Sequence, residues 1–207
     1  MKERIQQKAR ELFLRYGFRS VKMDDISKEL GISKKTVYQY FSDKDGLVEA
    51  IMLSEMAQMQ KNLSEEYLAK DAIDALFKNM LSFECQIDSL NPDILTDLEK
   101  CYPGTFQKFR QFKFDVLLEA VKTNLMRGVD EGLFRPEIDV DIISKFRLES
   151  AFCIFNPELF PYGKYGLMDV AKEIFMLFIH GIVTQKGRAL LNQYMQKQLT
   201  QLEKSER

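Results

Sequence analysis

The placement of glycine and proline constrains this chain more than any other feature. Its 207 residues include ten glycines and five prolines, and most of these fall between long segments whose apolar residues recur with a helical period. No run alternates apolar and polar residues between turn signals, so we predict an all-α fold. The expected helices cover residues 2–16, 24–30, 34–40, 43–69, 71–88, 92–100, 104–131, 139–155, 167–185 and 188–203.

The beginning of the chain has the proportions of a helix-turn-helix. Two short helices, 24–30 and 34–40, are separated by Gly31-Ile32-Ser33, and Ser33 is a good N-cap for the second of them. Ser42-Asp43-Lys44-Asp45 resembles a capping box that opens a fourth helix. We therefore predict a three-helix DNA-binding domain over residues 1–48 and a helical ligand-binding and dimerisation domain over 49–207, joined rigidly within the fourth helix.

Charge and cysteine content place further limits on the function. The net charge is only −1, but lysine and arginine outnumber aspartate and glutamate by 11 to 8 in the first 50 residues. A mildly basic head therefore precedes an acidic body, which is compatible with binding to phosphates. The three cysteines form no Cys-x-x-Cys pair, no secretory signal is visible, and the apolar stretch at 174–183 is too short to span a bilayer. We expect a cytoplasmic protein that does not enter a membrane.

The outer face of the third helix carries side chains suited to reading DNA. At about 100° per residue, Val37 and Phe41 fall together on the inner side, while Lys35 and Gln39 point outward. Lysine can donate to guanine, glutamine can pair bidentately with adenine, and tyrosine hydroxyls can bind phosphates. The positions that flank this face are Lys34, Thr36, Tyr38 and Tyr40. An ordinary solvated helix face is the alternative interpretation.

The same region resembles a known family. The matching elements are Ala9-Arg10-Glu11-Leu12-Phe13, Tyr16-Gly17-Phe18, Met23-Asp24-Asp25-Ile26-Ser27, Gly31-Ile32-Ser33-Lys34-Lys35-Thr36-Val37-Tyr38-Gln39-Tyr40-Phe41 and Lys44-Asp45-Gly46-Leu47. Together they are similar to the DNA-binding domain of TetR-family repressors, and the Thr-Val-Tyr-x-Tyr-Phe-x-x-Lys core is highly specific.

This resemblance implies roles for individual residues. Tyr38, Tyr40 and Lys44 would contact phosphates, and the start of the third helix would contact bases. Lys22 departs from the family pattern, which has serine or threonine there. A lysine cannot accept an amide hydrogen bond, so the cap of the second helix is weakened, although its charge can still reach a phosphate. The predicted DNA-binding residues are Lys22, Ser33, Lys34, Lys35, Thr36, Tyr38, Gln39, Tyr40 and Lys44.

The helix over 167–185 predicts a dimer. From Ile174 onward it is apolar nearly all round, so both of its sides must be covered. A four-helix bundle made with the 139–155 helix of each chain resembles the family's dimer interface; burial within a monomer is the alternative. Helix-turn-helix proteins usually act as symmetric dimers. The predicted interface residues are Ile142, Ile143, Phe146, Ile174, Leu177, Phe178 and Ile182.

The helices after residue 49 are rich in aromatic side chains. The resemblance implies that some of them line a cavity for a small effector, whereas burial as plain core is the more common role for any one such residue. The predicted pocket residues are Phe83, Cys101, Tyr102, Phe106, Phe109, Phe152, Phe155 and Phe175. Cys85, Cys101 and Cys153 are expected to be buried small hydrophobic side chains.

These features predict a DNA-binding transcriptional regulator. The expected form is a homodimeric repressor that binds a palindromic, inverted-repeat operator in double-stranded DNA and is released by a small, largely apolar effector. An architectural or cell-cycle DNA-binding protein with the same head is the alternative. An enzyme is disfavoured because the sequence offers one histidine and no phosphate loop, metal cluster or nucleophile–base pair. No cofactor and no metal are expected.

Overall fold

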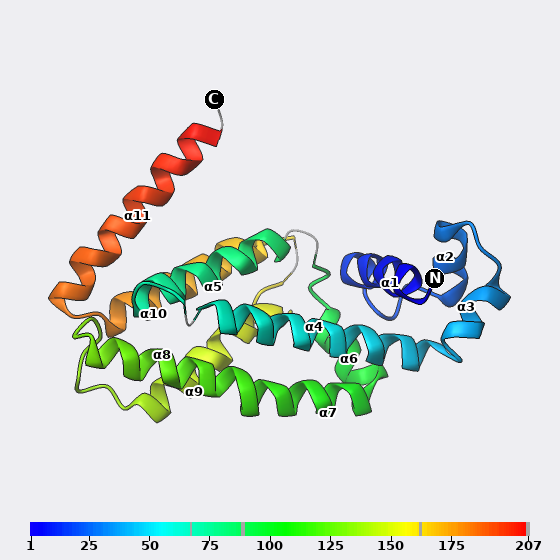
Figure 1. The fold of residues 1–207 in the computed structure, drawn as a ribbon, viewed down its shortest axis with the longest axis horizontal. Helices are drawn as coiled ribbons and strands as arrows, with labels where there is room; N and C mark the ends of the chain where they lie inside the picture. Colours follow the sequence, from blue (N-terminus) through cyan, green and yellow to red (C-terminus); the bar gives the residue numbers. More distant parts are fainter. Residues whose placement is uncertain (67, 88–89, 162, 206–207) are drawn as a thin grey trace.

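The chain forms an elongated, helical molecule with the N-terminal helices at one end (Figure 1). The computed structural model describes residues 1–66, 68–87, 90–161 and 163–205, with side chains excepted at 64–66, 85–86 and 197–205. This architecture confirms the all-α prediction. The helices are α1 (Lys2–Tyr16), α2 (Met23–Leu30), α3 (Lys34–Tyr40), α4 (Lys44–Glu66), α5 (Ala72–Ile87), α6 (Ile94–Cys101), α7 (Pro103–Phe112), α8 (Leu118–Asp130), α9 (Val140–Phe152), α10 (Leu167–Ile182) and α11 (Gln185–Ser205).

Two of the expected helices differ in detail from those observed. The segment 104–131, predicted as one helix, contains a π-helical turn at Lys113–Leu117 between α7 and α8. The segment 139–155 ends in a tighter 3-10 turn at Cys153–Phe155. A period of apolar residues cannot distinguish these variants, because they change the hydrogen-bond register without changing which side chains are apolar.

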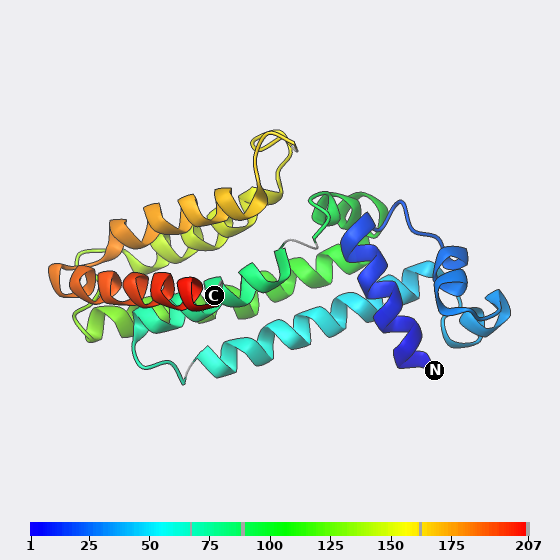
Figure 2. The same ribbon diagram turned by 90° about the horizontal axis from the view of Figure 1, so that it is seen from above.

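The head is built by α1, α2 and α3 on a first core cluster of buried apolar side chains, which continues along α4 to α6, α7 and α10. Ile5 and Phe13 of α1 pack with Ile26 of α2 and Leu47 at the start of α4, and all four are fully buried. α4 then runs without interruption from the head into the body (Figure 2). It crosses the expected domain boundary at residues 48 and 49, so that division stays a prediction.

The body contains a second core cluster formed by α5, α8, α10 and α11. Phe77 of α5 meets Phe175 of α10 edge to face, with ring centres 5.8 Å apart. It also stacks on Tyr194 of α11 at 5.7 Å. α9 and α10 lie side by side along one edge of the body (Figure 2). α11 extends away from the other helices toward its C-terminal end (Figure 1).

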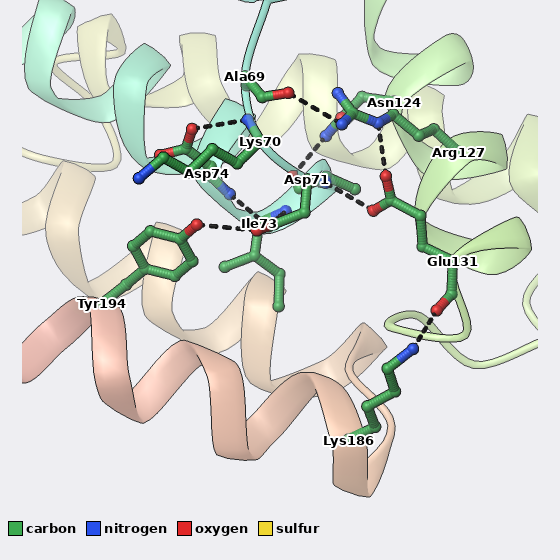
Figure 3. A network of polar contacts seen from close by, with 11 residues as sticks. Ala69, Lys70, Asp71, Ile73, Asp74, Asn124, Arg127, Glu131, Lys186 and Tyr194 are labelled. Atoms are coloured by element: carbon green, nitrogen blue, oxygen red, sulfur yellow. Dashed lines mark hydrogen bonds and ion pairs between the residues drawn. The ribbon is translucent and has the colours of Figure 1, made fainter.

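A polar network holds the connection between α4 and α5 to the body (Figure 3). Arg127 of α8 donates to the carbonyl of Ala69, at 2.9 Å, and to the Glu131 carboxylate, at 2.7 Å. The same carboxylate accepts the backbone N–H of Ala72 at 2.8 Å. Tyr194 of α11 donates to Asp71 at 2.8 Å. The α4–α5 connection is therefore bound to α8 and α11.

None of the described helices is long and apolar enough to cross a bilayer.

Candidate nucleic-acid interface

The turn before α3 is shaped by one glycine and one serine. Gly31 adopts a left-handed conformation with φ of 64° and ψ of 32°, which costs glycine little. Ser33 is the N-cap, and its hydroxyl accepts the backbone N–H of Thr36 at 3.1 Å. The same hydroxyl hydrogen-bonds the Thr36 hydroxyl at 2.8 Å. The cap fixes where α3 begins, and therefore which of its residues point outward.

The orientation of α3 follows from its apolar anchor. Val37 is completely buried, whereas the side chains of Tyr38 and Tyr40 are 48% and 43% exposed. Phe41 is buried as well. Lys35 and Gln39 are both exposed, as the helical period predicts. One short helix thus carries a lysine, a glutamine and two tyrosines on a solvent-facing surface, with a valine behind them.

The other expected DNA contacts surround this surface. Lys34 is exposed and forms an ion pair with Asp24 of α2. Lys22 is exposed and occupies the N-cap of α2 without a side-chain cap. The Asp25 carboxylate instead accepts the Lys22 backbone N–H at 2.8 Å. The first turn of α2 is therefore stabilised by half of a capping box, and the Lys22 ammonium is left facing solvent.

Lys44 points inward rather than toward solvent. Its ammonium donates to the carbonyl oxygen of Phe18. It also lies over the rings of Phe13 and Tyr102, 5.7 and 5.9 Å from their centres. Partial burial lowers the pKa of Lys44. In this structure its side chain fastens the α1–α2 connection to the start of α4 and the end of α6.

The start of α4 also differs from expectation. The sequence pattern places Ser42 at the N-cap, but the residue that caps α4 is Asp43, whose carboxylate accepts the backbone N–H of Gly46 at 2.8 Å. A single cap by Asp43 thus replaces the expected capping box, because Gly46 at the third helical position has no side chain to complete one.

Comparison with known proteins identifies this arrangement. Residues 5–51 match the model of bacterial regulatory proteins of the tetR family. An uncharacterized HTH-type transcriptional regulator of Bacillus subtilis, YvaF, is 32% identical over 192 residues, which cover 90% of this chain and 97% of YvaF. The chain belongs to the TetR family of transcriptional regulators.

Two further relatives extend the comparison along the chain. The HTH-type transcriptional repressor AcnR of Corynebacterium glutamicum is 26% identical over 150 residues, covering 70% of this chain and 74% of AcnR. A TetR-family regulator structure from Agrobacterium tumefaciens superimposes with a TM-score of 0.73 at 18% identity, covering 88% of this chain and 97% of that one. The TetR-family fold therefore extends through the body as well as the head.

Hydrogen bonds between residues far apart in the sequence join the head of this TetR-family protein to its body. Local sequence patterns do not reveal them. The Arg10 guanidinium binds the Glu55 carboxylate of α4 through two hydrogen bonds, one of 2.9 Å, which raise the pKa of Arg10. Asp97 of α6 accepts the backbone N–H of Arg19 at 2.9 Å. These partners are separated by 45 and 78 residues, so the sequence contains no short-range signal of them.

The predicted pocket residues do not form one group. Tyr102, Phe109 and Phe155 are buried in the first core cluster, and Phe83, Phe106 and Phe152 pack against it. Phe175 belongs to the second cluster. Two hollows in the described part of the chain lie elsewhere, one along α7 and one between α1 and α4. A ligand pocket among these aromatic side chains stays a prediction.

The cysteines differ from the expectation that all are buried. Cys101 is exposed at the end of α6, so that prediction is wrong for this residue. Cys153 is partly buried, its thiol donates to the carbonyl of Ser150 at 3.1 Å, and burial raises its pKa. The side chain of Cys85 lies outside the described residues.

The predicted interface residues lie on two different faces. Ile142, Phe146 and Leu177 are 62%, 55% and 76% exposed on the outer side of α9 and α10. Ile143 and Ile174 are partly buried. Phe178 and Ile182 fill the second core cluster of the protomer itself, because α10 turns them inward. Phe178 and Ile182 therefore offer almost no surface to a partner. Among the predicted interface residues, Ile142, Phe146 and Leu177 expose the most apolar surface.

Proposed function

We propose that this TetR-family regulator is a cytoplasmic, dimeric repressor that binds an inverted-repeat operator. This proposal rests mainly on the exposed face of α3. Lys35 and Gln39 project from that face, and Val37 is completely buried behind them. In the major groove of DNA these two side chains would hydrogen-bond base edges. The kinship with AcnR, which is named a repressor, supports repression as the outcome.

The remaining polar groups of the head would hold the phosphate backbone. The exposed hydroxyls of Tyr38 and Tyr40 flank the reading face, and Lys22 and Lys34 add positive charge beside it. Contacts of this kind fix the orientation of a head on DNA and weaken with salt. Ser33 and Thr36 contribute at the N-terminal end of α3, whose backbone amides favour a nearby phosphate. Lys44 contributes mainly by fastening the loop that precedes α2.

A second copy of the chain would cover the outer face of α9 and α10. Ile142, Phe146 and Leu177 form an apolar surface that a soluble monomer would leave in water. A two-fold axis through this face pairs the same residues of both copies. Dimerisation also presents two α3 helices to successive major grooves, which are about 34–36 Å apart.

Release of DNA would follow when a ligand favours a different spacing of the two heads. α4 carries the head at one end, and the segment that follows its other end is bound to α8 through the Arg127–Ala69 hydrogen bond. A small movement in the body can therefore rotate the head about that end of α4. A coupling free energy of about 1–3 kcal/mol would weaken operator binding by roughly 5- to 150-fold.

Replacing Phe146 and Leu177 together by aspartate tests the dimeric repressor. Four charges on a two-fold apolar interface oppose association, so sedimentation velocity should show monomers. Operator affinity should fall by about 100-fold or more, because one head alone makes half of the contacts. The matched control is Leu159→Asp, which places a charge on a leucine of similar exposure in the loop after α9. A double variant that remains dimeric, or that binds the operator as the wild type does, contradicts the proposal.

A further inference from the structure

A positively charged side chain lies within the second core cluster. Arg147 of α9 extends its guanidinium across α10, with Cζ 5.5 Å from the ring centre of Phe175 and 5.2 Å from that of Phe178. Both rings are buried, and Arg147 itself is partly buried. The positive charge is therefore surrounded mainly by apolar side chains.

No described residue neutralises this charge. Three nearby carboxylates are paired with lysines, in the pairs Asp141–Lys145, Glu149–Lys113 and Glu84–Lys172. Asp169 and Glu173 of α10 likewise form no ion pair with Arg147. Within the described ranges, the guanidinium of Arg147 takes part in no ion pair and no hydrogen bond. Burial lowers its pKa to about 10, and no neighbouring carboxylate opposes that shift.

Such an arrangement is unfavourable for the unliganded protein. An aromatic face attracts a guanidinium but accepts none of its five N–H donors in a strong hydrogen bond. A desolvated cation without a counter-charge destabilises the fold. Among the described residues, no polar side-chain atom is both fully buried and without a hydrogen-bond partner. The guanidinium nitrogens therefore keep some contact with solvent.

We propose that Arg147 anchors a small amphiphilic carboxylate within the body. The planar guanidinium fork matches the two oxygens of a carboxylate, and the adjacent Phe175 and Phe178 rings suit an apolar body attached to it. Met80 and Met176 are partly buried in the same cluster, and methionine side chains repack readily around a ligand. The effector is thus an organic acid rather than a purely apolar molecule. This inference rests on the proposed function only for the effect of the bound acid on DNA binding.

A carboxylate from a second copy of the chain is a less suitable partner. Arg147 lies about 100° around α9 from Phe146, which faces outward. The rings beneath its guanidinium point into the protomer core and not toward the outer face. The counter-charge is therefore expected from a molecule that enters the body.

Thermal unfolding of the full-length protein tests this inference with defined probes. Hexanoate and phenylacetate are titrated in parallel with their neutral counterparts, hexanamide and phenylacetamide. Both acids should raise the unfolding temperature in a saturable manner, and each amide should bind at least about 10-fold more weakly than its acid. Arg147→Met should lose this preference while the unliganded variant remains at least as stable as the wild type. Arg147→Lys should fold and bind the acids several-fold more weakly than the wild type.

Three sets of results would overturn the inference. One is the failure of both acids to bind at millimolar concentration, or equal binding of acid and amide. Another is unchanged acid binding by Arg147→Met, or by Arg147→Lys if the methionine variant does not fold. The third is loss of the dimer in unliganded Arg147→Met, which would assign the counter-charge to a second copy. Operator binding is measured separately without acid: its failure in the wild type refutes the repressor proposal, whereas acid binding at Arg147 can still stand.

Discussion

Replacing Lys35 and Gln39 together by alanine is expected to reduce operator binding nearly to the level seen with unrelated DNA. Each good contact to a base contributes about 1–3 kcal/mol of discrimination, and a dimer would lose two such contacts in each half-site. Specific binding commonly exceeds non-specific binding by about 10³-fold or more, and most of that difference should disappear. Fluorescence anisotropy with operator and scrambled duplexes at the same salt concentration measures both quantities.

A control variant distinguishes the loss of contacts to bases from the loss of one positive charge per chain. Gln107 and Lys108 lie exposed on α7, outside the head, so their double replacement by alanine removes the same types of side chain. Lys108 is involved only in a surface ion pair with Glu49, which contributes little to stability. The control should bind the operator as the wild type does. Equal losses in both double variants would mean that affinity depends on net charge rather than on the face of α3.

The second large effect is expected from Gly128→Ala in α8. A Cβ atom at this position would lie 1.9 Å from Cδ2 and 2.2 Å from Cε2 of Phe134. Phe134 is completely buried, and its backbone N–H donates to the Gly128 carbonyl at 2.9 Å, so neither group can move without disturbing the turn after α8. We expect a loss of about 3 kcal/mol and a decrease in the melting temperature of roughly 10 °C.

Gly104→Ala is the matched control, since nothing lies within 4 Å of a Cβ atom at that position near the start of α7. It should be neutral or slightly stabilising, because alanine favours a helix over glycine. A Gly128→Ala variant as stable as Gly104→Ala would show that the ring of Phe134 does not constrain this position.

The reading helix could be predicted from sequence because its determinants are local. A hydrophobic repeat of four residues placed Val37 and Phe41 inward, and the structure confirms that both are buried. Ser33 lies two residues after the turn glycine Gly31, so the cap could be assigned from nearby residues alone. Exposure of Lys35 and Gln39 then follows from helix geometry.

The features that sequence could not provide depend on distant partners. Lys44 is drawn toward the Phe18 carbonyl, and Cys101 ends exposed, because the position of α6 against the head decides both environments. Phe178 and Leu177 are adjacent and equally apolar, yet one is buried in the protomer and the other is exposed. In a helix that is apolar nearly all round, the sequence does not show which side faces the core. Only the packing of α10 against α5 and α9 reveals which side faces outward.

Selection of bound sequences from random duplex DNA, carried out in parallel with the wild type and Gln39→Ala, measures most directly what the face of α3 does. The wild type should enrich an inverted repeat. Gln39→Ala should enrich the same repeat with relaxed preference at one symmetric position in each half-site, because a single side chain has been removed from each groove. Enrichment of no common sequence by the wild type, or identical preferences at every position for both proteins, would contradict the assignment of α3 as the helix that reads the operator.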